Sequence, residues 1–72
     1  MTSKVIELVG TSPKGWQEAA TNALASAVKT LRDITWVEVI GWSAKVENQK
    51  IAEYRATVKL AFNVREKVES SL

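Results

Sequence analysis

Two long strand-like runs in the second half of the chain restrict its fold more than any other feature. Residues 35–47 and 50–64 are rich in β-branched and aromatic side chains, and only Asn48 and Gln49 separate them. This pattern predicts a β-hairpin with a two-residue loop. Each strand would span about 40 Å at about 3.3 Å per residue, whereas a compact globule of this length has a radius of gyration of about 11 Å. We therefore expect a monomer to be incomplete and the chain to form a homo-oligomer.

The first half of the chain predicts one strand followed by one helix. Residues 4–9 are mostly apolar, and the residues 10–13 that follow them are typical of a turn. Ser12 is expected to cap a helix whose first position is Pro13. Apolar residues then recur at helical spacing: Trp16, Ala19, Ala20, Ala23, Leu24, Ala27, Val28 and Leu31. Half of these are alanines, so the helix can approach a sheet closely.

The order strand, helix, strand, strand predicts the fold class. It indicates an α+β fold in which one helix covers one face of a three-stranded antiparallel sheet. At 7.9 kDa, the whole chain, residues 1–72, is expected to be a single domain.

The hairpin loop predicts which residues face each other across the two long strands. Glu47 would face Lys50, Glu38 would face Lys59, and Gly41 would face Ala56. Strict alternation then places a core on one face: Val37, Val39, Gly41, Tyr54, Ala56, Val58, Leu60 and Phe62. The other face is amphipathic and is expected to be buried between subunits: Trp36, Glu38, Ile40, Trp42, Ala44, Glu53, Arg55, Thr57, Lys59 and Ala61.

The composition argues against metal and catalytic chemistry. The chain has no cysteine and no histidine, which excludes disulfides and the usual zinc sites. Asp33 is the only aspartate, and no serine has a base at a recognisable spacing. The protein is therefore expected not to be an enzyme.

Charge and hydropathy argue against nucleic-acid and membrane partners. The formal net charge is +2, and the basic residues are scattered among acidic ones instead of forming a cluster. The first ten residues, MTSKVIELVG, lack the apolar run of a signal peptide or a membrane span. A cytoplasmic location is therefore expected.

The tryptophans carry the main functional signal. Trp36 and Trp42 share a predicted face with charged residues, so each is either an anchor of a subunit contact or a stacking platform for a flat heterocycle. The residues alone leave both interpretations open. Trp16 continues the apolar stripe of the helix and is expected to fill the core or a subunit contact, and Tyr54 and Phe62 are expected beneath the helix.

Three segments resemble the dodecin family in their order, spacing and total length: VIELVGTSPKGWQEA, TLRDITWVEV and AEYRATVKLAFNV. The resemblance implies a strand-helix-strand-strand protomer whose sheet wraps partly around its helix, assembled into a hollow homododecamer that binds flavins. In the family, the tryptophan after the helix stacks on the isoalloxazine ring, and Trp36 holds that position. Two flavins lie between symmetry-related tryptophans at a two-fold axis, so each site is shared between subunits.

Two departures from the family pattern concern the polar contacts of the flavin. Arg55 stands where the family usually has glutamine, and arginine has donors but no acceptor. The ring N–H then needs another acceptor, such as Glu38 or a backbone carbonyl. Ser43 and Asn63 stand where some relatives that hold flavin mononucleotide (FMN) carry arginines, which favours riboflavin over FMN as the cofactor. The resemblance also places these residues among the flavin-binding positions: Val37, Glu38 and Lys45.

The predicted register makes the flavin site an inter-subunit site. Arg55 would face Trp42, about 20 Å along the strand from Trp36 at about 3.3 Å per residue. Both can therefore touch one flavin only from different subunits or if the strand bends sharply, and we expect the former. Trp42 is expected to hold Arg55 by a cation–π contact. The resemblance thus implies a protein that stores or sequesters riboflavin or FMN and quenches it without turnover. The alternative is an oligomeric structural or interaction module that has lost flavin binding.

Overall fold

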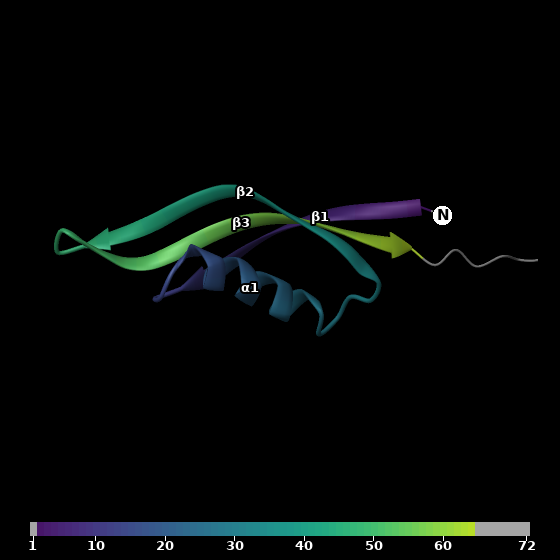
Figure 1. Ribbon diagram of the computed structural model, residues 1–72, viewed down its shortest axis with the longest axis horizontal. Coiled ribbons are helices and arrows are strands. Elements are labelled where there is room, and N and C mark those ends of the chain that lie inside the picture. The colour runs from purple at the N-terminus through teal and green to yellow at the C-terminus, as the bar shows by residue number, and fades with distance from the viewer. Residues whose placement is uncertain (1, 65–72) are drawn as a thin grey trace, which may run out of the picture.

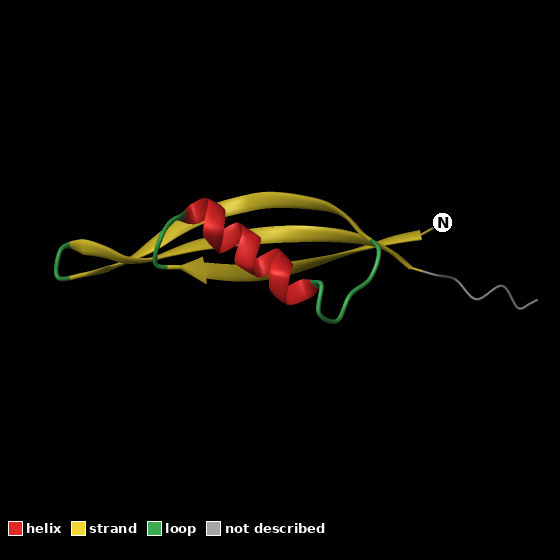
Figure 2. Cartoon of the chain, turned by 60° about the horizontal axis from the view of Figure 1, so that its bottom comes forward, coloured by secondary structure: helices red, strands yellow, loops and turns green. Residues whose placement is uncertain are grey.

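The computed structural model describes residues 2–64 and has the predicted order of elements (Figure 1). Strand β1 (Thr2–Ser12) leads to helix α1 (Trp16–Ala27), which is followed by strands β2 (Ile34–Glu47) and β3 (Lys50–Val64). The three strands form one antiparallel sheet in the order β1-β3-β2, and α1 crosses one face of it (Figure 2). The predicted α+β fold is therefore confirmed.

The hairpin between β2 and β3 has the predicted two-residue loop. Asn48 and Gln49 both adopt positive φ values, of 53° and 65°. Two consecutive positive φ angles are typical of the type I′ hairpin turn, whose twist matches that of the flanking strands. On either side of this loop Glu47 pairs with Lys50, and farther along Glu38 pairs with Lys59, as predicted.

The core lies between α1 and the central strand β3. The fully or nearly fully buried apolar residues come from these two elements: Ala19, Ala23, Ala27, Ala56, Val58 and Leu60. The alanines bring the helix close to the sheet, and Gly10 on β1 allows the closest approach. A Cβ atom at Gly10 would overlap the carbonyl oxygen of Ala19 and lie 2.8 Å from the Cβ of Ala23.

Helix α1 is shorter at both ends than the sequence pattern predicts. Ser12 does not cap it, because β1 continues through Ser12, which pairs with Tyr54. The buried Ser12 hydroxyl instead accepts a hydrogen bond from the Lys14 N–H at 3.0 Å, an interaction that stabilises the turn before the helix. At the other end, Leu31 lies beyond the last helical residue but still packs against the core.

A register shift in β2 corrects the predicted division of the sheet into faces. Val39 pairs with Val58 and Gly41 pairs with Thr57, so Ile40 is one extra residue on β2, a β-bulge. A second extra residue on β3, Ala52, restores the register near the loop. Strict alternation cannot anticipate such bulges, and a one-residue shift moves every following side chain to the opposite face.

The bulge places Trp42 on the helix-covered face, and Trp36 on the other. Trp42 pairs with the buried Ala56, and Ala44 pairs with Tyr54. The prediction that Trp42 and Ala44 share a face with Trp36 is therefore wrong. Gly41 was predicted to lie in the core. It pairs with Thr57 and therefore belongs to the face away from the helix.

The face away from the helix, called the outer face below, carries three rows of residues, one from each strand. On β3 it includes Glu53, Arg55, Thr57, Lys59, Ala61 and Asn63, as predicted for the first five. The partners of these residues add to the face: Ser3, Val5, Glu7, Val9 and Thr11 on β1, and Trp36, Glu38, Gly41, Ser43 and Lys45 on β2.

The molecule is long and thin, with extents of 62 × 19 × 14 Å and a radius of gyration of 15.9 Å. A compact globule of this size would have a radius of gyration of about 11 Å. The small core leaves large apolar side chains exposed on both faces, among them Val5, Val9, Trp36, Trp42 and Val46. This shape agrees with the expectation that the chain completes its core by self-association.

Gly10→Ala should destabilise the fold, because the added methyl overlaps the helix backbone at Ala19. Overpacking of this kind costs about 1–3 kcal/mol, and the midpoint of urea unfolding, measured at fixed protein concentration, should fall accordingly. Gly15→Ala is the matched control, since a Cβ there has no atom within 4 Å, and it should change stability by less than about 0.5 kcal/mol. Equal midpoints for the two variants would contradict the close packing.

Candidate functional site

Trp36 is the most exposed aromatic side chain on the outer face. It follows the loop after α1, lies on the edge strand β2, pairs with Ala61, and keeps 67% of its surface exposed. A hollow of about 360 Å³ beside it is lined by Val5, Glu38, Lys59 and Ala61. Because β1 and β2 both pair with β3, Val5 and Trp36 lie on either side of Ala61. The three strands together thus form a flat apolar floor next to an indole.

Opposite charges border this floor. Lys59 lies between Glu38 on β2 and Glu7 on β1, each of which is its cross-strand partner. The hollow therefore offers a hydrogen-bond acceptor in the Glu38 carboxylate and a donor in the Lys59 ammonium group. An apolar floor with a donor and an acceptor at its edge suits a planar heterocycle that carries both carbonyl and N–H groups.

Two more of the predicted site residues lie near Trp36 in the sheet. Asn63 is two positions from Ala61 on β3 and lies on the outer face, where its Oδ1 accepts a hydrogen bond from the Ser3 hydroxyl at 3.3 Å. Val37 pairs with Leu60, so its side chain points to the helix-covered face. Only the backbone of Val37 can take part in a site on the side of Trp36.

The other predicted site residues form a second group at a distance. Arg55 pairs with Ser43 on one side and Thr11 on the other. Lys45, the next outer-face residue on β2, contacts Glu47, with 3.4 Å between Nζ and Oε2. Arg55 is six residues from Ala61, or about 20 Å at about 3.3 Å per residue. The structure therefore does not bring Trp36 and Arg55 together within one chain.

Trp42 belongs to an aromatic cluster on the helix-covered face. Its ring centroid lies 6.3 Å from that of Trp16, and the Trp16 centroid lies 4.8 Å from that of Tyr54, both with the rings nearly perpendicular. The Trp16 indole N–H donates to the Ser43 carbonyl at 2.8 Å. The predicted cation–π contact between Trp42 and Arg55 is wrong, because the bulge at Ile40 separates them onto opposite faces.

Three residues that line the hollow were not predicted to belong to the site: Val5, Lys59 and Ala61. The predicted hairpin register had already placed Lys59 and Ala61 on the same face as Trp36. Only the place of Val5 depends on the position of β1. The pairing of β1 with β3 joins residues that are far apart in the sequence, from Thr2 with Val64 to Ser12 with Tyr54, and no local pattern specifies it. The alternation of apolar residues in β1 was the only available signal.

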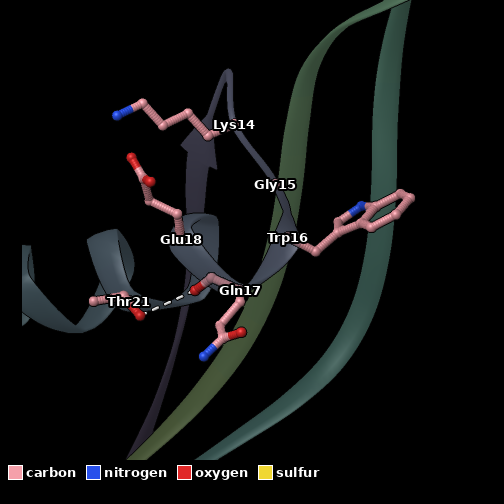
Figure 3. Close-up of a pocket in the computed structure, with 6 residues that line it drawn as sticks. All are labelled: Lys14, Gly15, Trp16, Gln17, Glu18 and Thr21. Atoms are coloured by element: carbon pink, nitrogen blue, oxygen red, sulfur yellow. Dashed lines mark hydrogen bonds between the residues drawn. The ribbon is translucent and has the colours of Figure 1, made fainter.

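A second hollow, of about 580 Å³, lies at the N-terminus of α1. It is lined by Lys14, Gly15, Trp16, Gln17, Glu18 and Thr21, and Figure 3 shows the Trp16 ring extending from it toward the strands. Lys14 and Glu18 carry opposite charges, and the Thr21 hydroxyl donates to the Gln17 carbonyl. This arrangement has no concentration of charge or of reactive groups that would indicate a ligand.

Residues 2–64 contain no group of three or more acidic or histidine side chains that could hold a metal ion. Helix α1, within this range, is too short and too polar to cross a membrane.

Comparison with known proteins identifies the family. The family model described as Dodecin matches residues 2–65. The dodecin of Thermus thermophilus is 38% identical over 63 residues, which cover 88% of this chain and 91% of that protein. The calcium dodecin of Mycobacterium tuberculosis is 34% identical over 62 residues, covering 86% and 87% of the two chains.

A solved structure supports the same assignment. The dodecin from Streptomyces coelicolor superposes with a TM-score of 0.88 at 38% identity, over 92% of this chain and 94% of that chain. Family model, sequence relatives and fold agree over nearly the whole described chain, and the chain therefore belongs to the dodecin family.

Proposed function

We propose that this protein stores a flavin by stacking the isoalloxazine ring on Trp36 within a homododecamer, without turning the cofactor over. The observation that carries the proposal is the exposed indole of Trp36 beside an apolar hollow on an edge strand. A planar ring fits this surface, since the indole and the floor formed by Val5 and Ala61 are both apolar. Membership of the dodecin family supports the choice of a flavin over other flat ligands.

Stacking on Trp36 supplies the first part of the affinity. Aromatic pairs contribute about 0.5–1.5 kcal/mol beyond the burial of their surface. Trp36 is too exposed to enclose a ligand alone, but two copies related by a two-fold axis close the site from both sides. With two flavins between the two indoles, each ring is covered by an indole on one side and by the second flavin on the other, which keeps water from both of its faces.

Polar groups near Trp36 orient the ring. The Glu38 carboxylate accepts a hydrogen bond from the ring N–H, and the Lys59 ammonium group donates to a ring carbonyl. Arg55 supplies further donors from a neighbouring subunit, because it lies about 20 Å from Trp36 along its own chain. Arg55 cannot accept a hydrogen bond, so Glu38 takes the accepting role that a glutamine would otherwise share.

A bound flavin would supply a photoexcitable ring. Stacking would hold the Trp36 indole in the close contact with that ring that quenching by electron transfer requires. Residues 2–64 bring no acid–base group or nucleophile against the floor beyond Glu38 and Lys59, which are cross-strand partners. The site is thus suited to holding a flavin and protecting it from light.

Trp36→Ala should abolish most riboflavin binding, because it removes the stacking surface. The variant loses the stacking contact and the apolar surface that the indole would bury against the ring, so binding should weaken at least about tenfold, or about 1.4 kcal/mol. The measurement is a titration of protein into riboflavin, followed by flavin fluorescence. Val9→Ala, an exposed apolar position on the outer face of β1, is the control and should bind as the wild type does. Equal quenching by Trp36→Ala and wild type would refute the stacking role.

Arg55→Gln should tighten riboflavin binding, because an amide both donates and accepts. One regained neutral hydrogen bond is worth about 0.5–1.5 kcal/mol, which corresponds to about two- to tenfold in the dissociation constant. Arg55→Lys, which keeps the charge without an acceptor, should not improve binding. If only Arg55→Gln quenches riboflavin and the wild type does not, the chain is an oligomeric module that has lost flavin binding. Weaker binding by Arg55→Gln would mean that the guanidinium itself contributes.

Asn63→Arg should shift the preference of the protein toward FMN. The wild type should bind riboflavin at least as tightly as FMN, since neither Ser43 nor Asn63 offers a charge to the phosphate. A charge-assisted hydrogen bond is worth about 1.5–3 kcal/mol, so the variant should gain affinity for FMN alone, and added salt should reduce this gain. Asn63→Gln is the neutral control. An equal gain for riboflavin and FMN would show that the arginine does not contact the phosphate.

A further inference from the structure

A neutral polar pair borders the hollow beside Trp36. Ser3 on β1 and Asn63 on β3 are cross-strand partners on the outer face, at the end of the sheet where β1 and β3 continue past the start of β2 (Figure 1). Asn63 is two residues from Ala61, and Ser3 is two residues from Val5. The pair is therefore the next pair of outer-face residues beyond the apolar floor, about 7 Å along the strands at about 3.3 Å per residue.

The structure holds the amide of Asn63 in one orientation. Its Oδ1 accepts a hydrogen bond from the Ser3 hydroxyl at 3.3 Å, and its backbone N–H donates to the Asp33 carbonyl at 3.1 Å. Because Oδ1 faces Ser3, the Nδ2 group faces away from it. A ligand that binds Nδ2 therefore does not need to order this side chain first, which lowers the entropic cost of binding.

The pair offers donors and acceptors together but no charge. Nδ2 of Asn63 carries two donor hydrogens, while Oδ1 and the Ser3 oxygen each keep a lone pair that can accept. A chain of hydroxyl groups matches this surface, because every hydroxyl both donates and accepts. A phosphate only accepts and is bound best by cations, and the neighbouring Lys4, which pairs with Phe62, lies on the helix-covered face.

The other border of the apolar floor is charged. Glu38 and Lys59 are cross-strand partners there, and both line the hollow. These two groups suit the carbonyl and N–H groups of a flat ring, as in the proposed function. The floor thus lies between a charged border and a neutral polar border. A ligand that matches all three parts has a polar heterocycle and also an uncharged hydrophilic chain.

We propose that Ser3 and Asn63 recognise the ribityl chain of the flavin, so that the protein selects a flavin with this polyol over one that lacks it. Asn63 contacts the chain, and Ser3 is a positioning residue that fixes the orientation of the amide. This inference rests on the proposed function, because it requires the ring to stack on Trp36. It goes further by naming the part of the ligand that determines selectivity.

The test compares riboflavin with lumiflavin, which has the same ring but a methyl group in place of the ribityl chain. The wild type should bind riboflavin at least about twofold more tightly than lumiflavin, since one neutral hydrogen bond is worth about two- to tenfold in affinity. Asn63→Ala should weaken riboflavin binding by this factor and leave lumiflavin binding unchanged. Both affinities are measured by quenching of flavin fluorescence, and unchanged lumiflavin binding also shows that the variant is folded.

Two substitutions of Ser3 separate its hydroxyl from its place in the strand. Ser3→Ala should weaken the binding of riboflavin and not that of lumiflavin, because the Asn63 amide loses the bond that orients it. Ser3→Thr keeps the hydroxyl and should bind both flavins as the wild type does. Thr21→Ala is the control, since it removes a hydroxyl that bonds the Gln17 carbonyl within α1, on the other side of the sheet (Figure 2).

The two ligands distinguish failure of this inference from failure of the proposed function. Equal or tighter binding of lumiflavin by the wild type, or an equal loss of both ligands in Asn63→Ala and Ser3→Ala, would overturn the proposal. A Ser3→Thr variant that behaves as Ser3→Ala does would overturn the role of the hydroxyl. A wild type that quenches both flavins equally refutes only the selection of the chain, whereas one that quenches neither refutes flavin storage and this inference with it.

Discussion

The mismatch in length between one short helix and three long strands governs the rest of this structure. Helix α1 covers about 18 Å of a sheet whose longest strand has 15 residues, or about 50 Å at about 3.3 Å per residue. The helix can therefore bury only the middle of β3, where Ala56, Val58 and Leu60 are completely inaccessible. Both ends of the helix-covered face and the whole outer face remain for other copies of the chain to cover.

The extra residue Ile40 determines on which face of the sheet each of the two tryptophans of β2 lies. Without the bulge at Ile40, Trp36 and Trp42 would both lie on the outer face. With it, Trp36 stands on the outer face and Trp42 packs against Trp16 on the other. Bulges often occur where a strand must redirect a side chain, and here the redirection separates the proposed ligand surface from the aromatic cluster of Trp16, Trp42 and Tyr54.

The sequence predicts most of the fold because its patterns are local. The alternation from Tyr54 to Phe62 assigns the faces of β3 correctly, and the loop at Asn48 and Gln49 sets the register at both Glu47 and Glu38. Alternation fails on β2 beyond Val39, since Ile40 and Trp42 are both apolar and suit either face. Ser12 was assigned to the helix because serine favours caps, but its pairing with Tyr54 keeps it in β1.

The candidate site is less predictable than the fold, because it depends on pairings that no local pattern specifies. The sequence places Trp36 on the outer face, and the family resemblance suggests its role. The sequence does not indicate Val5, which reaches the same floor from a strand about thirty residues earlier through a shared partner, Ala61. Nor does it show that Arg55 faces Ser43, because the bulge shifts that pairing by one residue.

In the proposed flavin site, the separation of Trp36 and Arg55 links ligand binding to assembly. Both lie on the outer face of one chain but about 20 Å apart, so a ligand that touches both must bridge two chains. Such a ligand binds the multimer and not the isolated chain, and its binding free energy therefore adds to that of assembly. A chain whose own core is a few alanines, a valine and a leucine gains from this linkage, since the ligand stabilises the same contacts that complete the fold.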